Sequence, residues 1–260
     1  RHSVVRLQIR RMNSREKMVI CGPIRNGASY IVNAYKNLSL LADQFDIKFI
    51  VYENDSTDNT VSLIKSTGMG IICESFKNKV PRTVAIAHAR NTLVKKILEK
   101  YSDYDYMLMV DLDGPAGSLN IGSISKIIDQ YRDVDWAGLS AISDPYYDIW
   151  ALRCDNNVFG KVDYDCWHEV NFKGGDIDVH VTNNQITVNT SELIPVESAF
   201  NGASIYKMKY IQPKYCGWHD TYGEQVDHLG LHQHITNTGG KLYICPQLQV
   251  APEMMHIRRK

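Results

Sequence analysis

Two carboxylates flank one apolar residue at the end of an apolar run. Asp111 and Asp113 follow the segment YMLMV at residues 106–110. Alternate residues of an extended chain project to the same side, and two like charges held there repel unless a cation lies between them. Carboxylate oxygens suit Mg²⁺ or Mn²⁺, and such a metal would bridge and neutralise the oxygens of a diphosphate. We therefore predict a metal and diphosphate site at Asp111 and Asp113, with an Asp-Gly turn as the structural alternative.

Polar residues also follow two earlier apolar runs. Pro23 and Asn26 come after MVICG, and Glu53 and Asp55 come after IKFIVY. Ligands of parallel α/β sheets bind outside the carboxyl ends of the strands, where a carboxylate can accept hydrogen bonds from a ribose or a base. These four residues are therefore predicted to hold a nucleoside. The alternative for Asp55, or for one of the two residues after it, is to cap the next helix.

Two arginines lie in PRTVAIAHARNTLV, a segment with helical spacing. Arg82 and Arg90 are eight residues apart, so we expect them to share one face of the helix. Arginine forms bidentate contacts with phosphates, and both residues are predicted to contact the nucleotide. The alternative for each is an ion pair at the surface.

Acids and imidazoles gather near the end of the chain. Glu224 and Asp227 are three residues apart on a helix expected at residues 224–236, so both can reach one side of it. An acid in this place could deprotonate a hydroxyl, with Asp227 as the first choice and Glu224 as the second. His232, or else His256, is predicted to complete the metal site begun by the two aspartates.

Four residues of the second half are candidates for binding an acceptor. Trp150 and Arg153 offer an aromatic face and a cation in one alternating segment. Asn201 and Gly202 form a segment that a ligand could approach closely, because glycine has no side chain. A place in the core for Trp150 and a plain turn at Asn201 are the alternatives.

Strands and helices that would position these residues alternate along the first half. The apolar runs are nearly continuous, as in strands that are buried on both faces. We predict an α/β fold with a mostly parallel central sheet and helices on both faces. The expected strands are residues 18–22, 47–52, 70–73 and 106–110, and the expected helices are residues 30–42, 60–65 and 84–100.

The second half is less regular. We predict a basic lead-in at residues 1–17 and one domain at residues 18–260, in which residues 18–122 bind the nucleotide and residues 123–260 bind the acceptor. Residues 145–196 are rich in Asn, Asp, Tyr and Gly and carry few helix patterns. Besides residues 224–236, the expected elements are a helix at 123–131 and strands at 136–142, 203–206 and 241–245.

Composition excludes several classes of protein. The 260 residues carry 29 basic and 29 acidic side chains, whereas a nucleic-acid binder usually has a basic excess. No run reaches the roughly 18 apolar residues of a membrane helix, and residues 1–17 lack the apolar core of a signal peptide. The six cysteines form no C-x-x-C pair, which favours a reducing compartment. We expect a cytoplasmic protein, or one of the Golgi lumen if an upstream membrane anchor was removed.

The motifs together resemble the glycosyltransferases of the GT-A fold. They are a Pro-x-x-Asn loop after the first run, ENDSTDNT after the second, AHARN on a helix and VDLDG after the fourth. In that family the Asp-x-Asp motif holds Mn²⁺ or Mg²⁺ and the diphosphate of a nucleotide sugar. The segments YDIWALR, FNGASIY and DHLGLH narrow the resemblance to the fungal capsule-associated α-1,3-mannosyltransferases and related viral glycosyltransferases. Two departures are Asn201, where a Gly-Gly pair is expected, and Asp227, where the relatives usually have Glu.

The resemblance covers residues 18–246 and implies a Rossmann-like GT-A sheet and an enzyme. This enzyme would move a sugar from a GDP- or UDP-sugar to a hydroxyl of a glycan acceptor, and Asp227 would act as a base only if the reaction inverts the anomeric configuration. A sugar-nucleotide nucleotidyltransferase is one rival, although GPIRNGAS is a poor version of its Gly-rich basic loop. A non-catalytic carbohydrate-binding module, suggested by the 15 tyrosines, is the other.

Overall fold

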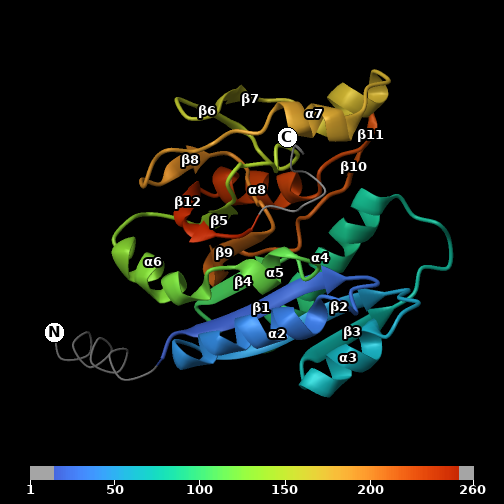
Figure 1. The fold of residues 1–260 in the computed structure, drawn as a ribbon, viewed down its shortest axis with the longest axis vertical. Coiled ribbons are helices and arrows are strands. Elements are labelled where there is room, and N and C mark those ends of the chain that lie inside the picture. Colours follow the sequence, from blue (N-terminus) through green and yellow to red (C-terminus); the bar gives the residue numbers. More distant parts are fainter. Residues whose placement is uncertain (1–14, 252–260) are drawn as a thin grey trace.

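An eight-stranded sheet with the order β3-β2-β1-β4-β9-β5-β12-β8 forms the centre of the computed structural model, which describes residues 15–251 (Figure 1). Strands β1, β2, β3 and β4 run parallel to one another, as do β5 and β12, whereas β9 and β8 run antiparallel to their neighbours. The predicted α/β class with a mostly parallel sheet is confirmed. The sheet strands are β1 (Lys17–Ile24), β2 (Asp46–Asn54), β3 (Gly70–Glu74), β4 (Tyr106–Val110), β5 (Gly138–Ile142), β8 (Ile194–Val196), β9 (Ala203–Lys207) and β12 (Leu242–Gln249).

Helices cover both faces of this sheet. In Figure 1, α2 lies in front of the strands and α4 behind them. The α-helices are α2 (Ile31–Ser39), α3 (Thr60–Thr67), α4 (Arg82–Tyr101), α5 (Pro115–Ser118), α6 (Ile124–Gln130), α7 (Ile177–Asn183) and α8 (His228–Asn237). Shorter turns are η1 (Leu40–Asp43), η2 (Ile121–Ser123), the π-helical η3 (Trp167–Phe172) and η4 (Met208–Tyr210). Two small hairpins pair β6 (Cys154–Asn156) with β7 (Gly160–Val162) and β10 (Trp218–His219) with β11 (Gly223–Glu224).

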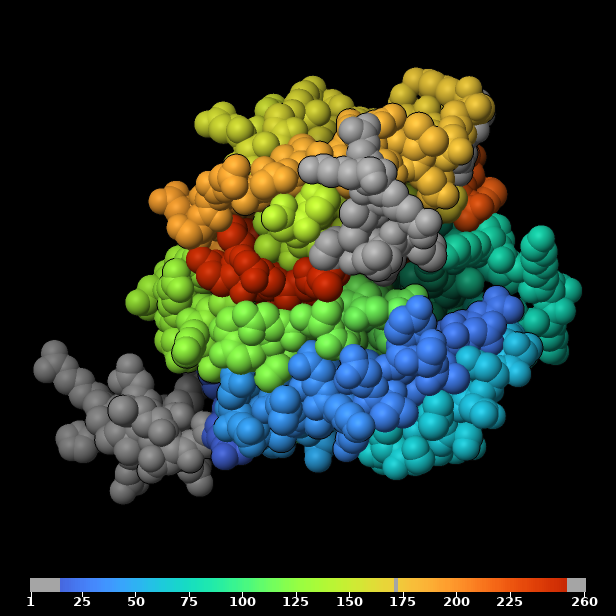
Figure 2. Space-filling model, viewed as in Figure 1, coloured from blue at the N-terminus to red at the C-terminus, as the bar shows by residue number. Residues whose placement is uncertain are grey.

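Alternate residues of the central strands enter two separate cores. On β4, Leu108 and Val110 pack with α2 and α6, whereas Met107 and Met109 pack with α4 and α8. All four side chains are fully buried. This arrangement explains why the run is apolar at every position, since a strand with helices on both faces has no solvent side. In the space-filling view the N-terminal segments, in blue and teal, lie at the bottom, green segments lie above them, and the yellow to red segments lie toward the top (Figure 2).

Several expectations are corrected. The helix expected from residue 224 begins at His228, because Glu224 pairs with Trp218 in the β10–β11 hairpin. The irregular stretch contains α7, whose first turn is capped by the Asp176 carboxylate. All six cysteines are free thiols, and Cys73 is exposed on β3, the edge strand of the sheet.

Some expectations fall outside the described residues. These are residues 1–14 of the expected basic lead-in, and His256. Within residues 15–251, every helix is too short or too polar to cross a bilayer.

Candidate active site

The loops that follow β1 and β2 are joined at the carboxyl edge of the sheet. The backbone N–H of Asn26 donates to Ser56 Oγ at 2.9 Å, and the Thr57 N–H donates to Asn26 Oδ1 at 2.8 Å. Asn26 adopts a φ of 52°, a left-handed conformation that asparagine tolerates better than most residues. Pro23 lies in β1 opposite Tyr52, one position before Glu53. The structure thus brings together the four residues predicted to hold a nucleoside.

Glu53 and Asp55 order the chain around them. The buried Glu53 accepts the Ser56 N–H at 2.8 Å. Asp55, with φ 53°, accepts hydrogen bonds from the Ser75 hydroxyl and, at 3.2 Å, from the Phe76 N–H. The Ser75 bond, followed by one from the Asn54 side chain, holds the pKa of Asp55 below its usual value. The carboxylate therefore stays ionised and ties the loop after β2 to the end of β3, and Asp58 rather than Asp55 accepts the Thr60 N–H of α3.

Arg90 of α4 occupies the centre of the site. Its guanidinium is buried and donates to Asp111 Oδ1 at 2.9 Å and to a carboxylate oxygen of Asp227. A third hydrogen bond, of 2.6 Å, reaches His228 Nε2. The guanidinium carbon lies 4.8 Å from the centre of the Phe200 ring, which adds a cation–π contact. One buried cation thus links the end of β4 to the start of α8.

Burial and charge fix the protonation states in this cluster. Burial lowers the pKa of Arg90, but the charges of Asp227 and Asp111 raise it by more, so it stands above its usual value. Burial, and then the charge of Arg90, lower the pKa of His228 well below its usual value. His228 is therefore neutral, and since Nε2 accepts from Arg90, its proton lies on Nδ1. In the described part of the chain, the buried Nδ1 of His228 and Nε of Arg90 have no hydrogen-bond partner, as is typical of groups that meet water or a ligand.

The two arginines do not form one cationic face. Arg82, in the first turn of α4, is exposed, whereas Arg90 is buried. Eight residues advance an α-helix by two turns and about 80° more, which is enough to separate a solvent-facing position from a core-facing one. Only Arg90 belongs to the cluster.

Glu224 and Asp227 do not share a helix face. Glu224 lies on β11, and its carboxylate accepts the Thr83 hydroxyl at 2.8 Å and the Thr83 N–H at 3.3 Å in the first turn of α4. A negative charge there satisfies a helix N-terminal donor and the helix dipole. Asp227 is the N-cap residue of α8 and is buried in its contact with Arg90. Glu224 thus has a structural partner away from the cluster.

Asn201 and Gly202 form a tight turn beside Asp111. Both have positive φ, 53° and 82°, and the Ala203 N–H returns to the Phe200 carbonyl at 3.3 Å, the pattern of a type I′ turn. The Gly202 carbonyl accepts the Asp111 N–H at 2.8 Å. Asn201 is fully buried, and its N–H donates to the Asp148 carboxylate at 2.7 Å. The space beside Gly202, where an acceptor was expected to approach, is filled by Pro115: a Cβ on Gly202 would lie 2.5 Å from Pro115 Cγ.

Gly202→Ala is expected to destabilise the protein by about 2–4 kcal/mol, combining left-handed backbone strain with overpacking against Pro115. Gly68→Ala is the matched control, because Gly68 has a φ of 76° and nothing within 4 Å of an added Cβ. Urea unfolding of both variants separates the two effects. Equal losses would show that the contact with Pro115 adds nothing.

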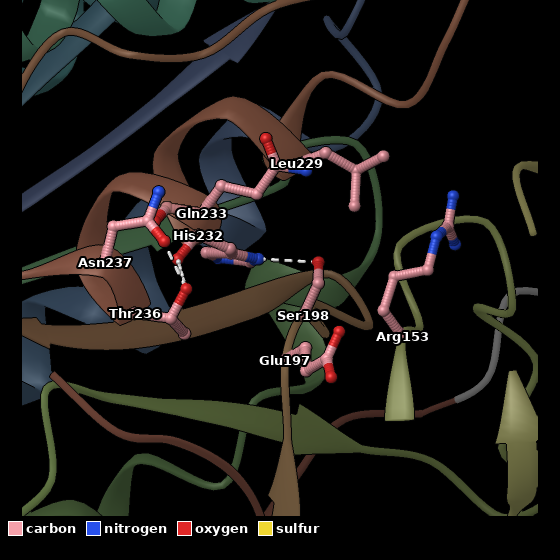
Figure 3. Close-up of a pocket in the computed structure, with 8 residues that line it drawn as sticks. All are labelled: Arg153, Glu197, Ser198, Leu229, His232, Gln233, Thr236 and Asn237. Carbon is pink, nitrogen blue, oxygen red and sulfur yellow. Dashed lines mark hydrogen bonds between the residues drawn. The ribbon is translucent and has the colours of Figure 1, made fainter. Parts of the chain in front are cut away.

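His232 lies in the interior with both ring nitrogens engaged. Ser198 Oγ lies 2.7 Å from Nδ1, and the Tyr206 hydroxyl lies 2.8 Å from Nε2. Burial, followed by the charge of Arg90, lowers its pKa to about 3. Figure 3 shows the ring directed from α8 toward Ser198, beside a cavity of about 360 Å³. The predicted role as a metal ligand does not fit these contacts.

Arg153 and Trp150 serve the internal structure of the second half. Arg153 is buried and donates to Asp165 at 2.9 Å and to the backbone carbonyls of Trp150 and Leu152. The half-buried Trp150 packs against two hydrophobic clusters. The expected anion contact of Arg153 is thus replaced by an internal ion pair, and the core alternative for Trp150 is the one observed.

Asp111 and Asp113 differ in their surroundings. Asp111 is half-buried in its ion pair with Arg90, whereas Asp113 is exposed on the following turn. Within residues 15–251, no group of three or more His, Cys, Asp or Glu side chains is arranged to hold a metal by itself. Mg²⁺ in phosphate-binding sites commonly takes one or two carboxylates and completes its shell with phosphate oxygens and water. Two hard oxygen donors on this turn fit such a metal.

The residues around Arg90 include three that the sequence reasoning did not select. They are His228, Phe200 and Tyr215, whose ring centre lies 5.8 Å from the guanidinium carbon. Asp148, which holds the Asn201 turn, was also missed. Helical spacing could have predicted the burial of Arg90, because position 90 lies on the same buried stripe of α4 as Ala87 and Val94.

The fold is the GT-A arrangement found in nucleotide-sugar glycosyltransferases. No protein-family profile matches the sequence, and no curated protein matches it. Among solved structures, the mannosyltransferase PcManGT from Pyrobaculum calidifontis, in complex with GDP-Man and Mn²⁺, superimposes with a TM-score of 0.53 and 13% identity over 93% of this chain. Glucosyl-3-phosphoglycerate synthase from M. tuberculosis gives a TM-score of 0.51 and 12% identity over 96% of this chain and 75% of its own length.

The same synthase, in complex with Mg²⁺ and uridine-diphosphate, also gives a TM-score of 0.51, with 12% identity over 96% of this chain and 74% of its own. The present chain spans 59% of the length of the mannosyltransferase. At these identities the likeness concerns the fold.

Proposed function

We propose that the protein is a metal-dependent glycosyltransferase that moves a sugar from a nucleotide diphosphate sugar to a hydroxyl of a glycan acceptor. The observation that carries the proposal is the buried cluster in which Arg90 joins Asp111, at the end of β4, to Asp227, at the start of α8. It adjoins the carboxyl edge of a GT-A sheet, where α/β proteins bind their ligands. Fixed carboxylates at that edge suit a metal-bound diphosphate.

In this proposal Asp113 holds Mn²⁺ or Mg²⁺ and Asp111 supports it. Arg90 orients Asp111 through the 2.9 Å hydrogen bond. When bound, the metal stabilises the negative charge that develops on the departing diphosphate. The protein supplies two carboxylates and the donor supplies phosphate oxygens, so a third protein ligand is not required.

The nucleoside would lie against the joined loops after β1 and β2. Asp55→Ala is expected to weaken binding of UDP or GDP about tenfold, the size of one lost charge-assisted hydrogen bond, and to change the turnover number less. Asp163→Ala is the control, because Asp163 is an aspartate away from these loops whose pKa is likewise lowered by a side-chain hydrogen bond, here from Lys161. Titration calorimetry measures both affinities. A complex with the nucleoside far from Asp55 would contradict this assignment.

The ion pair also bears on the stereochemistry of transfer. A general base must reach the acceptor hydroxyl directly or through one water, whereas the Asp227 carboxylate is directed to Arg90. This geometry supports a positioning role for Asp227 and a reaction that retains the anomeric configuration. The resemblance to the fungal α-1,3-mannosyltransferases supports the same outcome. NMR of the product determines its anomeric configuration and so tests it.

A thermal-shift experiment tests the proposed function. UDP, GDP and their glucose and mannose derivatives are added with Mn²⁺ or with EDTA. A ligand at about 100 times its Kd stabilises the native state by about 2.7 kcal/mol. We expect stabilisation by one nucleotide family and only with metal. Absence of any shift, or pyrophosphate release from a nucleoside triphosphate and a sugar phosphate, would refute it.

A further inference from the structure

The β10–β11 hairpin presents an exposed tryptophan. Trp218 is 48% exposed, although tryptophan is among the most costly side chains to leave in water. Its ring lies over Gly223, where an added Cβ would be 3.5 Å from the indole. The opposite strand therefore supports the ring with backbone at this position, and about half of the side chain stays exposed.

The hairpin is held rigidly. The Gln225 side chain donates to the carbonyls of Cys216 at 3.0 Å and Trp218 at 3.3 Å, and Cys216 Sγ donates to the Trp218 carbonyl at 3.1 Å. The Gly217 carbonyl accepts the Thr83 hydroxyl at 2.8 Å. A surface tryptophan on such a support loses little conformational entropy when a ligand stacks on it.

The hairpin adjoins the candidate active site at both of its ends. Tyr215 precedes it and Asp227 follows it, and both contact Arg90. At the base of the hairpin, the Cys216 N–H donates a hydrogen bond of 2.9 Å to the Asp227 carbonyl. Trp218 and Glu224 are cross-strand partners, so their side chains share one face, and Glu224 reaches the first turn of α4. In Figure 1, β10 and β11 stand beside that end of α4.

Other rings of this segment pack on one another, and His219, which follows Trp218 on β10, points to the opposite face of the hairpin. His219 and Tyr222 stack at 4.0 Å with an interplanar angle of 9°, and His168 of η3 lies 4.4 Å from Tyr222. Rings with polar edges and apolar faces match a pyranose, which has hydroxyls at its rim and C–H groups on its faces. A protein partner would call for a larger apolar patch than one tryptophan and a tyrosine.

We infer that Trp218 is the stacking platform of an oligosaccharide acceptor. This inference rests on the proposed function for the role of acceptor, but not for the binding of a glycan. The platform lies beside the site rather than at the metal carboxylates, so it would set acceptor affinity and leave donor binding unchanged.

The test compares Trp218→Ala and Trp218→Phe with the wild-type chain. Saturation-transfer NMR and calorimetry use α-1,3-mannotriose, maltotriose, cellotriose and chitotriose, with and without Mn²⁺ and the stabilising nucleotide. We expect at least one trisaccharide to bind the wild type, about 3- to 10-fold weaker binding in Trp218→Ala, the usual size of an aromatic stacking contact, and retention in Trp218→Phe. Leu40→Ala, which truncates a side chain 53% exposed on η1, should bind like the wild type.

The outcomes separate the inference from the proposed function. Nucleotide binding without Trp218-dependent binding of any trisaccharide overturns the platform and leaves the glycosyltransferase standing. Trisaccharide binding that depends on Trp218 without any nucleotide binding supports the platform and refutes the proposed function. Unchanged melting temperatures verify that the variants are folded, and an equal loss in Leu40→Ala would also overturn the platform.

Discussion

Replacing Arg90 by methionine is expected to destabilise the native state by about 3–5 kcal/mol, the usual cost of removing one partner from a buried ion pair. Methionine keeps much of the side-chain volume between Phe200 and Tyr215, so packing is largely preserved. The loss arises because Asp227 and Asp111 are left without the cation that compensates them. Urea unfolding monitored by circular dichroism measures the change in the free energy of unfolding.

Two further variants test the physical reason. Arg132→Met removes an arginine paired with Glu16 and Asp129 at the surface and should cost about 1 kcal/mol or less. Asp227→Asn combined with Arg90→Met should recover part of the loss, since one uncompensated charge is then gone. Additive losses in the double variant would show that Arg90 and Asp227 are not energetically coupled.

The sequence was enough to predict a sheet covered by helices on both faces, because this feature depends on the pattern of residues within single strands. YMLMV is apolar at every position, and the structure sends Leu108 and Met109 to different cores. The insertion of β9 between β4 and β5 was not accessible. It depends on pairings between residues nearly a hundred positions apart, such as Leu108 with Ile205.

The candidate site was partly accessible for the same reason. Carboxylates after strands are fixed by chain order, so Asp55 and Asp111 could be placed at one edge. The partners of Arg90 could not be predicted in this way, because they come from four separate segments of the chain. The expected start of the helix at Glu224 was wrong because of a turn: Gly223, with a φ of 89°, allows a hairpin where helical spacing alone favoured a helix.

His232 illustrates a different difficulty. Its spacing from His228 is equally suited to a metal site and to a stacked pair, and the rings lie 5.5 Å apart. In the structure the two ring nitrogens contact the hydroxyls of Ser198 and Tyr206, and neither of these residues is close to His232 in sequence. These two contacts join the ring of His232 on α8 to Ser198 and to Tyr206 of β9.

Asp113→Asn is expected to lower sugar transfer about 100-fold or more while leaving the melting temperature of the free protein nearly unchanged. The side chain is exposed and asparagine has nearly the same size and shape, so stability should change little. Asparagine keeps the shape but removes the charge on a metal ligand, and a metal that neutralises a leaving group contributes several kcal/mol to the transition state. The Mn²⁺-dependent thermal shift with a nucleoside diphosphate should disappear in the same variant, because nucleotide and metal bind as one unit.

The control for this variant is Asp133→Asn, which neutralises another exposed aspartate, situated after α6. It should retain both the transfer rate and the metal-dependent shift. Asp111→Asn should differ from both, since it also weakens the ion pair with Arg90 and so lowers stability together with transfer. Near-normal turnover of Asp113→Asn in EDTA would remove the metal from the mechanism and leave Arg90 as the cation facing the diphosphate.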